Sequence, residues 1–260
     1  MTAGPAPLSA VLITYNEEDR LPDALRSVHF CDEVVVVDAG STDGTRRVAE
    51  AAGARVLLNA PWPGFLAQRQ FAAAAARHDW ILAVDSDERV SGPLRQEIEE
   101  RRGRGFDAAG YYIPRVTHYL GRWIRATDWY PDLQLRLFDR RRGRWQGGLV
   151  HESVRVEGTP GRLRHELQHH SYRSADEHLH RIHEYARLWA EQAFGEGRRA
   201  SLPSAFAAGA WAFFRNLVLR RGLLLGTTGL AVSTLNAHYA FAKLLLLREL
   251  ARTRAEARPE

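Results

Sequence analysis

The chain has 260 residues, which is enough for one large domain or for one domain with a helical appendage. Hydrophobic residues make up 45% of it, and no long tract of Pro, Gly or Ser indicates extensive disorder. The single cysteine, Cys31, excludes an intramolecular disulfide and a cysteine-rich zinc site. The net charge of +5 comes from arginine, because Lys243 is the only lysine, and by itself it suits nucleic acid, anionic lipid or phosphorylated substrates equally.

The first hundred residues alternate between strand and helix patterns. Short apolar runs predict strands at residues 8–14, 33–38, 55–58 and 80–84. The segments between them predict helices at residues 19–28, 46–52 and 65–77. Alternation at this spacing favours βαβ units, so we expect an α/β fold with a parallel sheet and helices on both of its faces.

The pattern changes after Gly110. Further strands are predicted at residues 110–116, 134–138 and 154–156, which suggests a mixed extension of the sheet. Residues 175–195 predict a long amphipathic helix, and the chain becomes strongly apolar after Pro203. The N-terminus lacks the basic start and long apolar run of a secretory signal, so a cytoplasmic location is expected.

The apolar tail of the chain is predicted to meet a membrane surface. Polar residues interrupt both of its apolar stretches, so neither is the clean run of about 20 apolar residues that a spanning helix needs; the interruptions are Arg215, Asn236, His238 and Lys243. Aromatic and aliphatic side chains lie beside arginines there: Trp211, Phe213, Phe214 and Leu217 beside Arg215, Arg220 and Arg221. This combination is typical of a helix in the interface of an anionic membrane. The alternative is burial against the first domain or against a second copy of the chain.

The strongest local motif is the acidic triplet Asp85, Ser86 and Asp87, directly after the strand predicted at 80–84. In open α/β sheets, ligands bind beyond the carboxyl ends of the strands. Two carboxylates one residue apart there can share Mg²⁺ or Mn²⁺, which prefers oxygen ligands and keeps positions free for phosphate. A surface turn without a metal is the plainer interpretation of the same triplet.

Two more polar turns follow strand ends on the same predicted edge. Asp38 ends the run EVVVVD and precedes a turn of small residues, so it could accept hydrogen bonds from a uracil ring or a ribose. The turn of residues 14–18 follows the first strand, and Glu17 or Glu18 could reach the same nucleoside. Capping roles are the alternative for these acids and for Asp43. Three acidic turns at one edge together predict a nucleotide site more strongly than any one of them does.

These segments resemble glycosyltransferase family 2, whose members have a nucleotide-binding α/β domain of the GT-A type. The resemblance rests on VLITYNEE, VVVVDAGSTDGT and WILAVDSDE, over roughly residues 8–100. It extends to the subgroup of bacterial lipopolysaccharide core glucosyltransferases of the inner membrane. That extension rests on WPGF with Gln68 and Arg69, on YIPR, on QLRLF, on VHE and on the apolar tail.

The resemblance implies a domain division and a set of binding residues. It implies a catalytic domain of residues 1–172, with a nucleotide-binding half at 8–100 and an acceptor half at 101–172, and a membrane-associating helical region at 173–260. The nucleotide-binding residues would be Thr14, Tyr15, Asn16, Glu17, Asp38, Gln68, Arg69, Asp85, Ser86 and Arg136, and Asp87 with Asp85 would ligate the metal. Many family members have two acids at the start of the second motif, whereas this chain has Asp38 followed by Ala39.

The family reaction proceeds with inversion and needs a carboxylate that deprotonates the acceptor hydroxyl. Glu152 is the first candidate for this base, with His151 beside it as an orienting group or metal neighbour, and Asp128 is the reserve. A surface strand residue is the plainer interpretation of Glu152. Six histidines between residues 165 and 183 are expected to be helix surface and core residues, because they form no tetrahedral ligand set.

The resemblance further implies a hexose, glucose first, transferred from a nucleotide donor with UDP favoured to an envelope glycolipid. ADP-heptose, GDP-sugars and a polyprenyl phosphate acceptor stay open. A sugar nucleotidyltransferase would carry a basic Gly-rich loop where this chain has TYNEE, and a non-catalytic membrane adaptor would lack the acidic triplet or the base. No recognisable nucleic-acid-binding motif accompanies the arginines, so no nucleic-acid partner is expected.

Overall fold

The computed structural model describes residues 4–147 and 152–256. The chain forms two compact units. The first contains Met1–Val116 and Asp132–His169, and the second contains Thr117–Pro131 and His170–Glu260. The predicted domain division at residue 172 stays a prediction.

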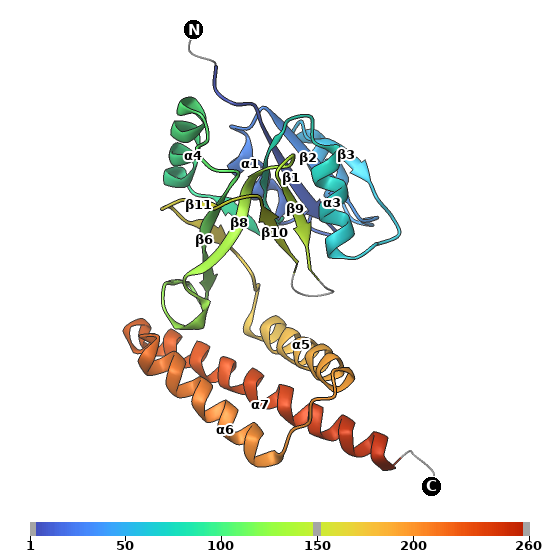
Figure 1. Ribbon diagram of the computed structural model, residues 1–260, viewed down its shortest axis with the longest axis vertical. Coiled ribbons are helices and arrows are strands. Elements are labelled where there is room, and N and C mark those ends of the chain that lie inside the picture. The colour runs from blue at the N-terminus through green and yellow to red at the C-terminus, as the bar shows by residue number, and fades with distance from the viewer. Residues whose placement is uncertain (1–3, 148–151, 257–260) are drawn as a thin grey trace. The chain divides into compact units, whose positions relative to one another are not determined.

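The first unit is built on a mixed sheet (Figure 1). Its parallel part has the order β3-β2-β1-β4, formed by β1 (Leu8–Thr14), β2 (Glu33–Asp38), β3 (Arg55–Leu58) and β4 (Trp80–Ala83). The sheet continues as β8-β6-β12-β5, with β8 (Asp132–Asp139) antiparallel to β4 and to β6 (Gly110–Tyr119). The last two strands are β12 (Leu167–His169) and β5 (Glu88–Val90), and β11 (Gly161–Arg162) pairs with β6.

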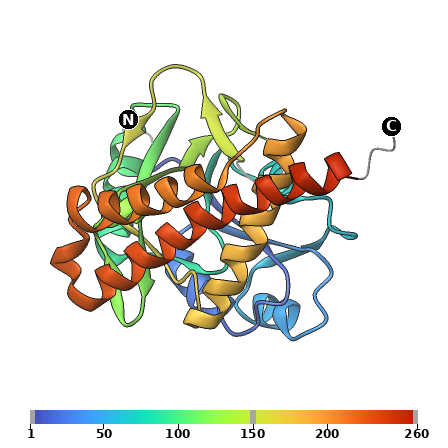
Figure 2. The same cartoon turned by 90° about the horizontal axis from the view of Figure 1, so that it is seen from below.

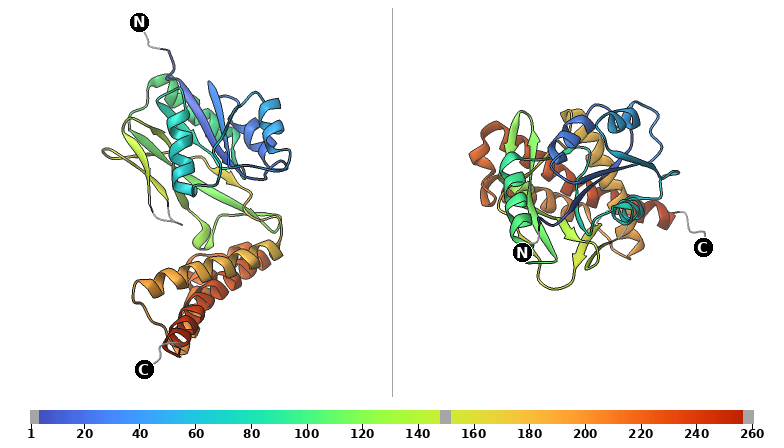
Figure 3. Two further views of the ribbon diagram at one scale, coloured as in Figure 1. Left: turned by 90° about the vertical axis from the view of Figure 1, so that its right-hand side faces the viewer. Right: turned by 90° about the horizontal axis from the view of Figure 1, so that it is seen from above.

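Helices cover both faces of this sheet, because the strands are apolar on both sides. In β1, Leu8, Ala10 and Leu12 face one core, which is covered by α1 (Leu21–Val28), α2 (Thr45–Ala51) and α4 (Gly92–Arg104). Val11 faces the other core, which is covered by α3 (Phe65–Ala75) and by the hairpin of β9 (Gly143–Gln146) and β10 (Ser153–Val156), as Figure 3 shows. The predicted α/β fold class, with a mixed sheet between helices, is confirmed.

The helix starts follow ordinary capping rules. Ser91 accepts a hydrogen bond from the Leu94 N–H at the start of α4, and Ser174 does the same for Glu177 at the start of α5 (Ala175–Gly195). The bounds predicted for α5 are confirmed, and the predicted helices of the first half end within a few residues of α1, α2 and α3. The sequence analysis missed α4, β5, β9 and β12.

The second unit is helical and contains α5, α6 (Leu202–Phe214) and α7 (Gly226–Glu256), with the short strand β7 (Arg122–Ile124) paired to the end of β6. In Figure 2, α6 and α7 lie side by side, joined by a π-helical turn (Arg215–Leu219) and a 3-10 turn (Gly222–Leu225). A Cβ added at Gly209 would lie 3.3 Å from the Ala237 carbonyl oxygen, so α6 and α7 approach each other closely at this glycine.

One helical segment of the described chain, Gly222–Arg254, is long and apolar enough to cross a membrane by length and composition. Asn236, His238 and Lys243 interrupt this segment, and its most apolar window has a mean hydropathy of 1.3; the predicted surface attachment stays a prediction. Most of that window is not buried in the protein, since the buried share is 22%.

Candidate functional site

The turns after β1 and β2 interlock at the carboxyl edge of the parallel strands. The Asn16 N–H donates to Ser41 Oγ at 2.8 Å, and the Thr42 N–H donates back to Asn16 Oδ1 at 2.9 Å. The Glu17 N–H donates to Thr45 Oγ1 at 2.8 Å. Asn16 has a left-handed backbone with φ of 54°, which Asn tolerates better than most residues. The two turns predicted to bind the nucleoside therefore form one ordered unit.

Asp38 is completely buried beneath these turns. Its carboxylate accepts hydrogen bonds from the Gly40 and Ser41 N–H groups at 3.0 and 2.9 Å, and Thr14 Oγ1 lies 3.4 Å away. The Ser41 hydroxyl also donates to it. Arg46 Nε lies 3.8 Å from the same carboxylate. Asp38 thus fixes the turn that follows β2, in agreement with the capping interpretation of the sequence.

Asp85 is held by two arginines. Arg69 contacts both carboxylate oxygens, at 2.8 and 3.0 Å, and Arg136 donates to one of them at 2.6 Å. Burial opposes ionisation of Asp85, but the guanidinium groups of Arg136 and Arg69 outweigh it and hold the pKa of Asp85 well below its usual range. Asp85 is therefore an anion that fixes two cations.

This ion-pair network continues into the core through Glu88. Glu88 is fully buried, and its Oε1 lies 3.1 Å from Arg136 and 2.9 Å from Arg115. Burial lowers the pKa of Arg136, but Asp85 and Glu88 raise it above its ordinary value, so this arginine, 3% exposed, keeps its charge. Such a network persists only when each charge has a partner.

Asp87 has a different environment from Asp85. Its Oδ2 lies 3.4 Å from His169 Nε2 and 3.7 Å from Arg20, and Arg20 also lies 3.8 Å from Glu17 in the β1 turn. Burial raises the pKa of Asp87, while the hydrogen bond and charge of His169 and the charge of Arg20 lower it to a value below the ordinary one. Arg20 thereby connects the turn after β4 with the turn after β1.

Asp87 and His169 fit a divalent cation. Two ligands at right angles around an ion with bonds of about 2.1 Å are about 3 Å apart, which is close to the separation observed here. Carboxylate and water oxygens suit Mg²⁺ and Mn²⁺, and imidazole is a common ligand of divalent transition metals. The described residues contain no group of three or more His, Cys, Asp or Glu side chains that could hold a metal. Two protein ligands would leave the other positions to water and phosphate.

Glu152 directly precedes β10 in the β9–β10 hairpin, and its side chain contacts this network. Its Oε1 is 3.4 Å from Arg69 Nε, and its side chain is 14% exposed. Trp145 stacks beneath both arginines, with Arg69 at 4.8 Å and Arg136 at 5.8 Å from its ring centroid. The Arg136 Nε and Trp145 Nε1 donors are buried, without a hydrogen-bond partner among the described residues. The predicted neighbour of Glu152, His151, lies outside the described residues.

The remaining predicted residues are spread over the rim and beyond it. Gln68 is buried in α3 and accepts from Asn59 at 2.8 Å, Ser86 is buried between the two acids, and Tyr15 is exposed. Asp128 belongs to the second unit, where Asn216 donates to it at 2.9 Å and Arg215 forms an ion pair with it. The structure therefore brings Asp85, Asp87, Arg69, Arg136 and Glu152 together, and it gives Asp128 a local set of partners.

The sequence analysis missed several residues of this site. His169 was grouped with the surface histidines, and Arg20, Glu88, Arg115 and Trp145 were not singled out. Glu88 directly follows the acidic triplet, so its position was a usable signal. No spacing rule in the sequence connects His169 to Asp87, because the contact depends on the antiparallel pairing of β12 with β5, which opposes His169 to Glu88.

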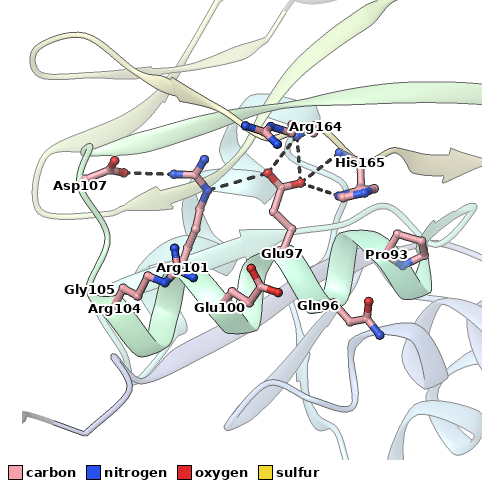
Figure 4. A pocket seen from close by; sticks show the side chains of 10 residues that line it. All are labelled: Pro93, Gln96, Glu97, Glu100, Arg101, Arg104, Gly105, Asp107, Arg164 and His165. Carbon is pink, nitrogen blue, oxygen red and sulfur yellow. Dashed lines mark hydrogen bonds and ion pairs between the residues drawn. The ribbon is translucent and has the colours of Figure 1, made fainter.

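A separate cavity of about 520 Å³ lies along α4 (Figure 4). Glu97 lies at its centre and accepts hydrogen bonds from the Arg164 and His165 N–H groups and from His165 Nδ1, the last at 2.9 Å. Arg101 links this cluster to Asp107 at 3.3 Å. None of the residues predicted for the nucleotide or the metal lines it.

The acidic and arginine-rich rim lies at the carboxyl ends of the parallel strands, where open α/β sheets of nucleotide-binding enzymes hold their ligands. The family model for glycosyl transferase family 2 matches residues 9–155, and this chain belongs to that family.

Relatives of the chain over most of its length are also named as glycosyltransferases. The chain is 31% identical, over 90% of its length and 89% of the other, to a lipopolysaccharide core biosynthesis glycosyltransferase, LpsC, of Rhizobium meliloti. It is 29% identical, over 93% and 90%, to an uncharacterized glycosyltransferase of Rickettsia conorii. Among solved structures, glucosyl-3-phosphoglycerate synthase of Mycobacterium tuberculosis in complex with Mn²⁺ and UDP is 27% identical, with a TM-score of 0.36 over 45% of each chain. That likeness is too partial to bear on the activity of this chain.

Proposed function

We propose that this family 2 glycosyltransferase transfers a hexose, with glucose as the first candidate, from a UDP-sugar to a glycolipid of the lipopolysaccharide core type, with inversion at the anomeric carbon. The observation on which the proposal mainly rests is the pairing of Asp87 with His169 at the sheet edge that also holds Asp38 and Glu152. The turns proposed to bind the nucleoside, the Asp87–His169 pair proposed to hold the cation and the Glu152 carboxylate all belong to the same unit.

The nucleoside would lie against the interlocked turns of residues 14–18 and 38–45. Tyr15 and Thr42 are exposed on these turns, while Asp38 holds the second turn from below. The diphosphate would then lie beside Arg20 and the acidic triplet, where the unpaired Arg136 Nε and Trp145 Nε1 donors suit anionic oxygens. Arg69 and Arg136 would serve this anion from the positions that Asp85 fixes.

Asp87 and His169 would hold a Mn²⁺ or Mg²⁺ ion, with Asp85 held close by through its arginines. A bound divalent cation at this position supplies charge that stabilises the departing diphosphate. Without the ion, His169 and Arg20 restrain the Asp87 carboxylate from two sides.

Glu152 would act as the general base. It accepts the proton of the acceptor hydroxyl, that oxygen forms the new bond to the anomeric carbon, and the nucleoside diphosphate leaves with the electron pair of the broken bond. Arg69 lies 3.4 Å from Glu152 and is itself fixed by Asp85, so the position of the base depends on the acidic triplet. Asp128 is the reserve candidate.

A relative of the chain supports the proposed acceptor, and the apolar tail of the chain supports the proposed location. The Rhizobium meliloti relative is named for lipopolysaccharide core biosynthesis, which favours a glycolipid acceptor here. We infer that the chain works in the cytoplasm, peripherally on the inner face of the bacterial inner membrane. A polyprenyl phosphate acceptor is the alternative that the same membrane location allows.

Slow donor hydrolysis by the purified chain tests this function without a known acceptor. UDP-, GDP- and ADP-sugars are offered with Mn²⁺, Mg²⁺ or EDTA, beside Asp87→Asn and beside Asp79→Asn, a half-buried carboxylate outside the predicted site, as the control. We expect one donor to be hydrolysed only with metal, Asp87→Asn to lose that turnover by a factor of about 100 or more, and Asp79→Asn to keep it.

The rival function is a non-catalytic membrane adaptor with the same fold. If no donor is hydrolysed and calorimetry detects no metal-dependent binding of UDP, GDP or ADP, the acidic rim is structural and the adaptor takes the place of the transferase. Hydrolysis that survives in EDTA would instead remove the metal from the proposal and leave the transferase.

A further inference from the structure

The outer face of α6 is apolar from one end of the helix to the other. Ala205, Gly209 and Ala212 are buried, and Gly209 packs on α7. The rest of the helix surface leaves large hydrophobic side chains exposed, namely Leu202, Phe206, Trp211 and Phe214. A water-exposed helix normally has one apolar face, against its own protein, so a helix that is apolar on both faces needs a second apolar neighbour.

The same apolar character continues around the turn between α6 and α7. Leu223 and Leu224 are 62% and 75% exposed at the 3-10 turn, although such side chains are costly to leave in water. Arg221 precedes them in a left-handed conformation with φ of 58°. Its backbone is hydrogen-bonded to Val218 and Leu224, but its guanidinium group has no hydrogen bond or ion pair within the part of the chain that the structure describes. We call these residues, together with the outer face of α6, the α6–η3 surface.

We propose that the α6–η3 surface inserts into the head-group and acyl boundary of an anionic phospholipid monolayer, with Leu223 and Leu224 in the acyl region and Arg221 on lipid phosphates. The proposal deepens the membrane location given under the proposed function and rests on it for its biological setting. Its physical basis is the pairing of aromatic and aliphatic side chains with adjacent arginines on one surface.

The charges favour lipid over a second copy of the chain. Arg220 Nε lies 3.6 Å from an Asp128 carboxylate oxygen, and more than half of the Arg220 side chain, at 56%, is exposed. Arg221 is exposed as well. A second copy would present the same leucines and the same Arg221, and so would bring two cations without ion-pair partners among the described residues toward each other. An anionic lipid surface satisfies both the apolar and the cationic residues.

The packing of α7 favours insertion in the plane of the membrane over a span. α7 packs against α5 as well as α6, and α5 has ion pairs between Arg181 and Glu177 and between Arg187 and Glu191 on its surface. Lys243 of α7 stacks on Trp189 of α5 at 4.7 Å. Taking α7 across the bilayer would take these charges into the hydrocarbon region, which is strongly unfavourable.

Flotation of the full-length chain with vesicles tests the surface. Vesicles of phosphatidylethanolamine and phosphatidylglycerol are compared with vesicles of phosphatidylcholine alone. We expect binding to the anionic vesicles only, with Leu223→Gln/Leu224→Gln weakened about tenfold or more and Leu179→Gln, an exposed leucine of α5, unchanged. Arg221→Gln should weaken binding roughly fivefold and reduce its salt dependence. Equal binding of the double variant and the wild type would overturn the proposal.

A fluorescent label reports insertion directly. With Cys31 replaced by alanine, the substitutions Leu224→Cys and Leu179→Cys each provide one site for a polarity-sensitive dye. We expect a blue shift on anionic vesicles at position 224 and none at 179. No shift at 224, or a shift of the same size at both, would contradict insertion through this surface.

Two further measurements separate the possible failures. Light scattering without lipid should give a monomer mass; a dimer that Leu223→Gln/Leu224→Gln converts to a monomer would assign the surface to a second copy and overturn the proposal. Donor hydrolysis in the absence of membranes should be the same for this variant and the wild type. If the wild type hydrolyses no donor but still floats, the proposed enzyme function fails while the lipid surface stands.

Discussion

The two units of this protein distribute polarity in opposite ways. The first unit buries charge: Arg69, Arg136 and Glu88 lie below its sheet edge, each paired with an opposite charge. The second unit exposes apolar side chains, with Trp211 and Leu224 more than half accessible. Both arrangements are unfavourable for a protein that needs only to be stable in water.

The contrast shows where each unit is expected to meet its ligand. Buried charges are retained where an anionic or reacting group must be held in a fixed geometry, because a preorganised polar site need not rearrange during reaction. Exposed apolar side chains are retained where another apolar phase will cover them. The predictions that follow change one side of this contrast at a time.

The largest effect is expected at the base. Glu152→Gln keeps the shape of the side chain and removes the proton acceptor, so transfer to an acceptor should fall by a factor of about 100 to 10,000. Nucleotide binding by calorimetry should be unaffected. Glu157→Gln, on the same hairpin but exposed, serves as the control. Near-normal transfer by Glu152→Gln would move the role to another carboxylate, with Asp128→Asn as the next variant.

Removing one buried arginine tests whether the stability of the first unit depends on every buried charge having an oppositely charged partner. Arg136→Met leaves Asp85 and Glu88 without their shared partner, so the free energy of unfolding in urea should fall by about 3–5 kcal/mol. Arg95→Met breaks an exposed pair with Glu99 on α4 and should cost about 1 kcal/mol or less. Equal losses in the two variants would show that burial adds nothing to the interaction.

Close helix packing is the corresponding test in the second unit. Gly209→Leu forces a side chain against Ala237 and Phe241, and we expect it to lower the free energy of unfolding by about 1–3 kcal/mol. Ala207→Leu, on the exposed side of α6, should leave stability nearly unchanged. A stable Gly209→Leu variant would mean that α6 and α7 can separate at little cost.

The smallest effect is a pH dependence of the second unit. Burial lowers the pKa of His178 to about 4, and the ring accepts or donates a hydrogen bond at Tyr119 and stacks on Tyr172. Between pH 4 and 6.5 the unfolded chain therefore binds more protons at this residue than the folded chain does. The stabilisation is complete above pH 6.5 and is lost as the pH falls, by at most about 1.4 kcal/mol per pH unit.

Urea unfolding at several pH values checks this sign. The variant His178→Gln should be less stable than the wild type at pH 7 but should show a smaller loss on acidification. His180, which is exposed on the same helix, provides the control variant His180→Gln, with an unchanged slope. A steeper slope in His178→Gln than in the wild type would contradict burial of a neutral ring.

Much of the parallel sheet could be predicted from local patterns. The run at residues 33–38 is β-branched and ends at a turn of small residues, and the structure has β2 at those residues. The prediction failed where no local apolar pattern exists. The α4 helix is dominated by charged residues, and β12 has three residues, so both depend on the sheet and core that they join.

In the site, too, the features that depend on local sequence could be predicted and the contacts between distant residues could not. The acidic triplet and Asp38 could be placed at one edge of the sheet, because the carboxyl ends of parallel strands lie together. The partners of those acids could not be found in this way: Arg136 reaches Asp85 from β8, and His169 reaches Asp87 from β12. Contacts between residues far apart in sequence depend on strand order and register, which a single sequence does not reveal.

The sequence by itself determined the α/β class, the family and the edge of the sheet where the acidic turns meet, because strand periodicity and short motifs are local properties of the chain. Only the tertiary structure decided that Asp85 binds two arginines while Asp87 faces a histidine. Only it decided that one face of α6 is left uncovered. Both depend on which side chains pack together in three dimensions. The pattern of acidic and apolar residues along the chain would be the same in any other packing, so it cannot specify these contacts.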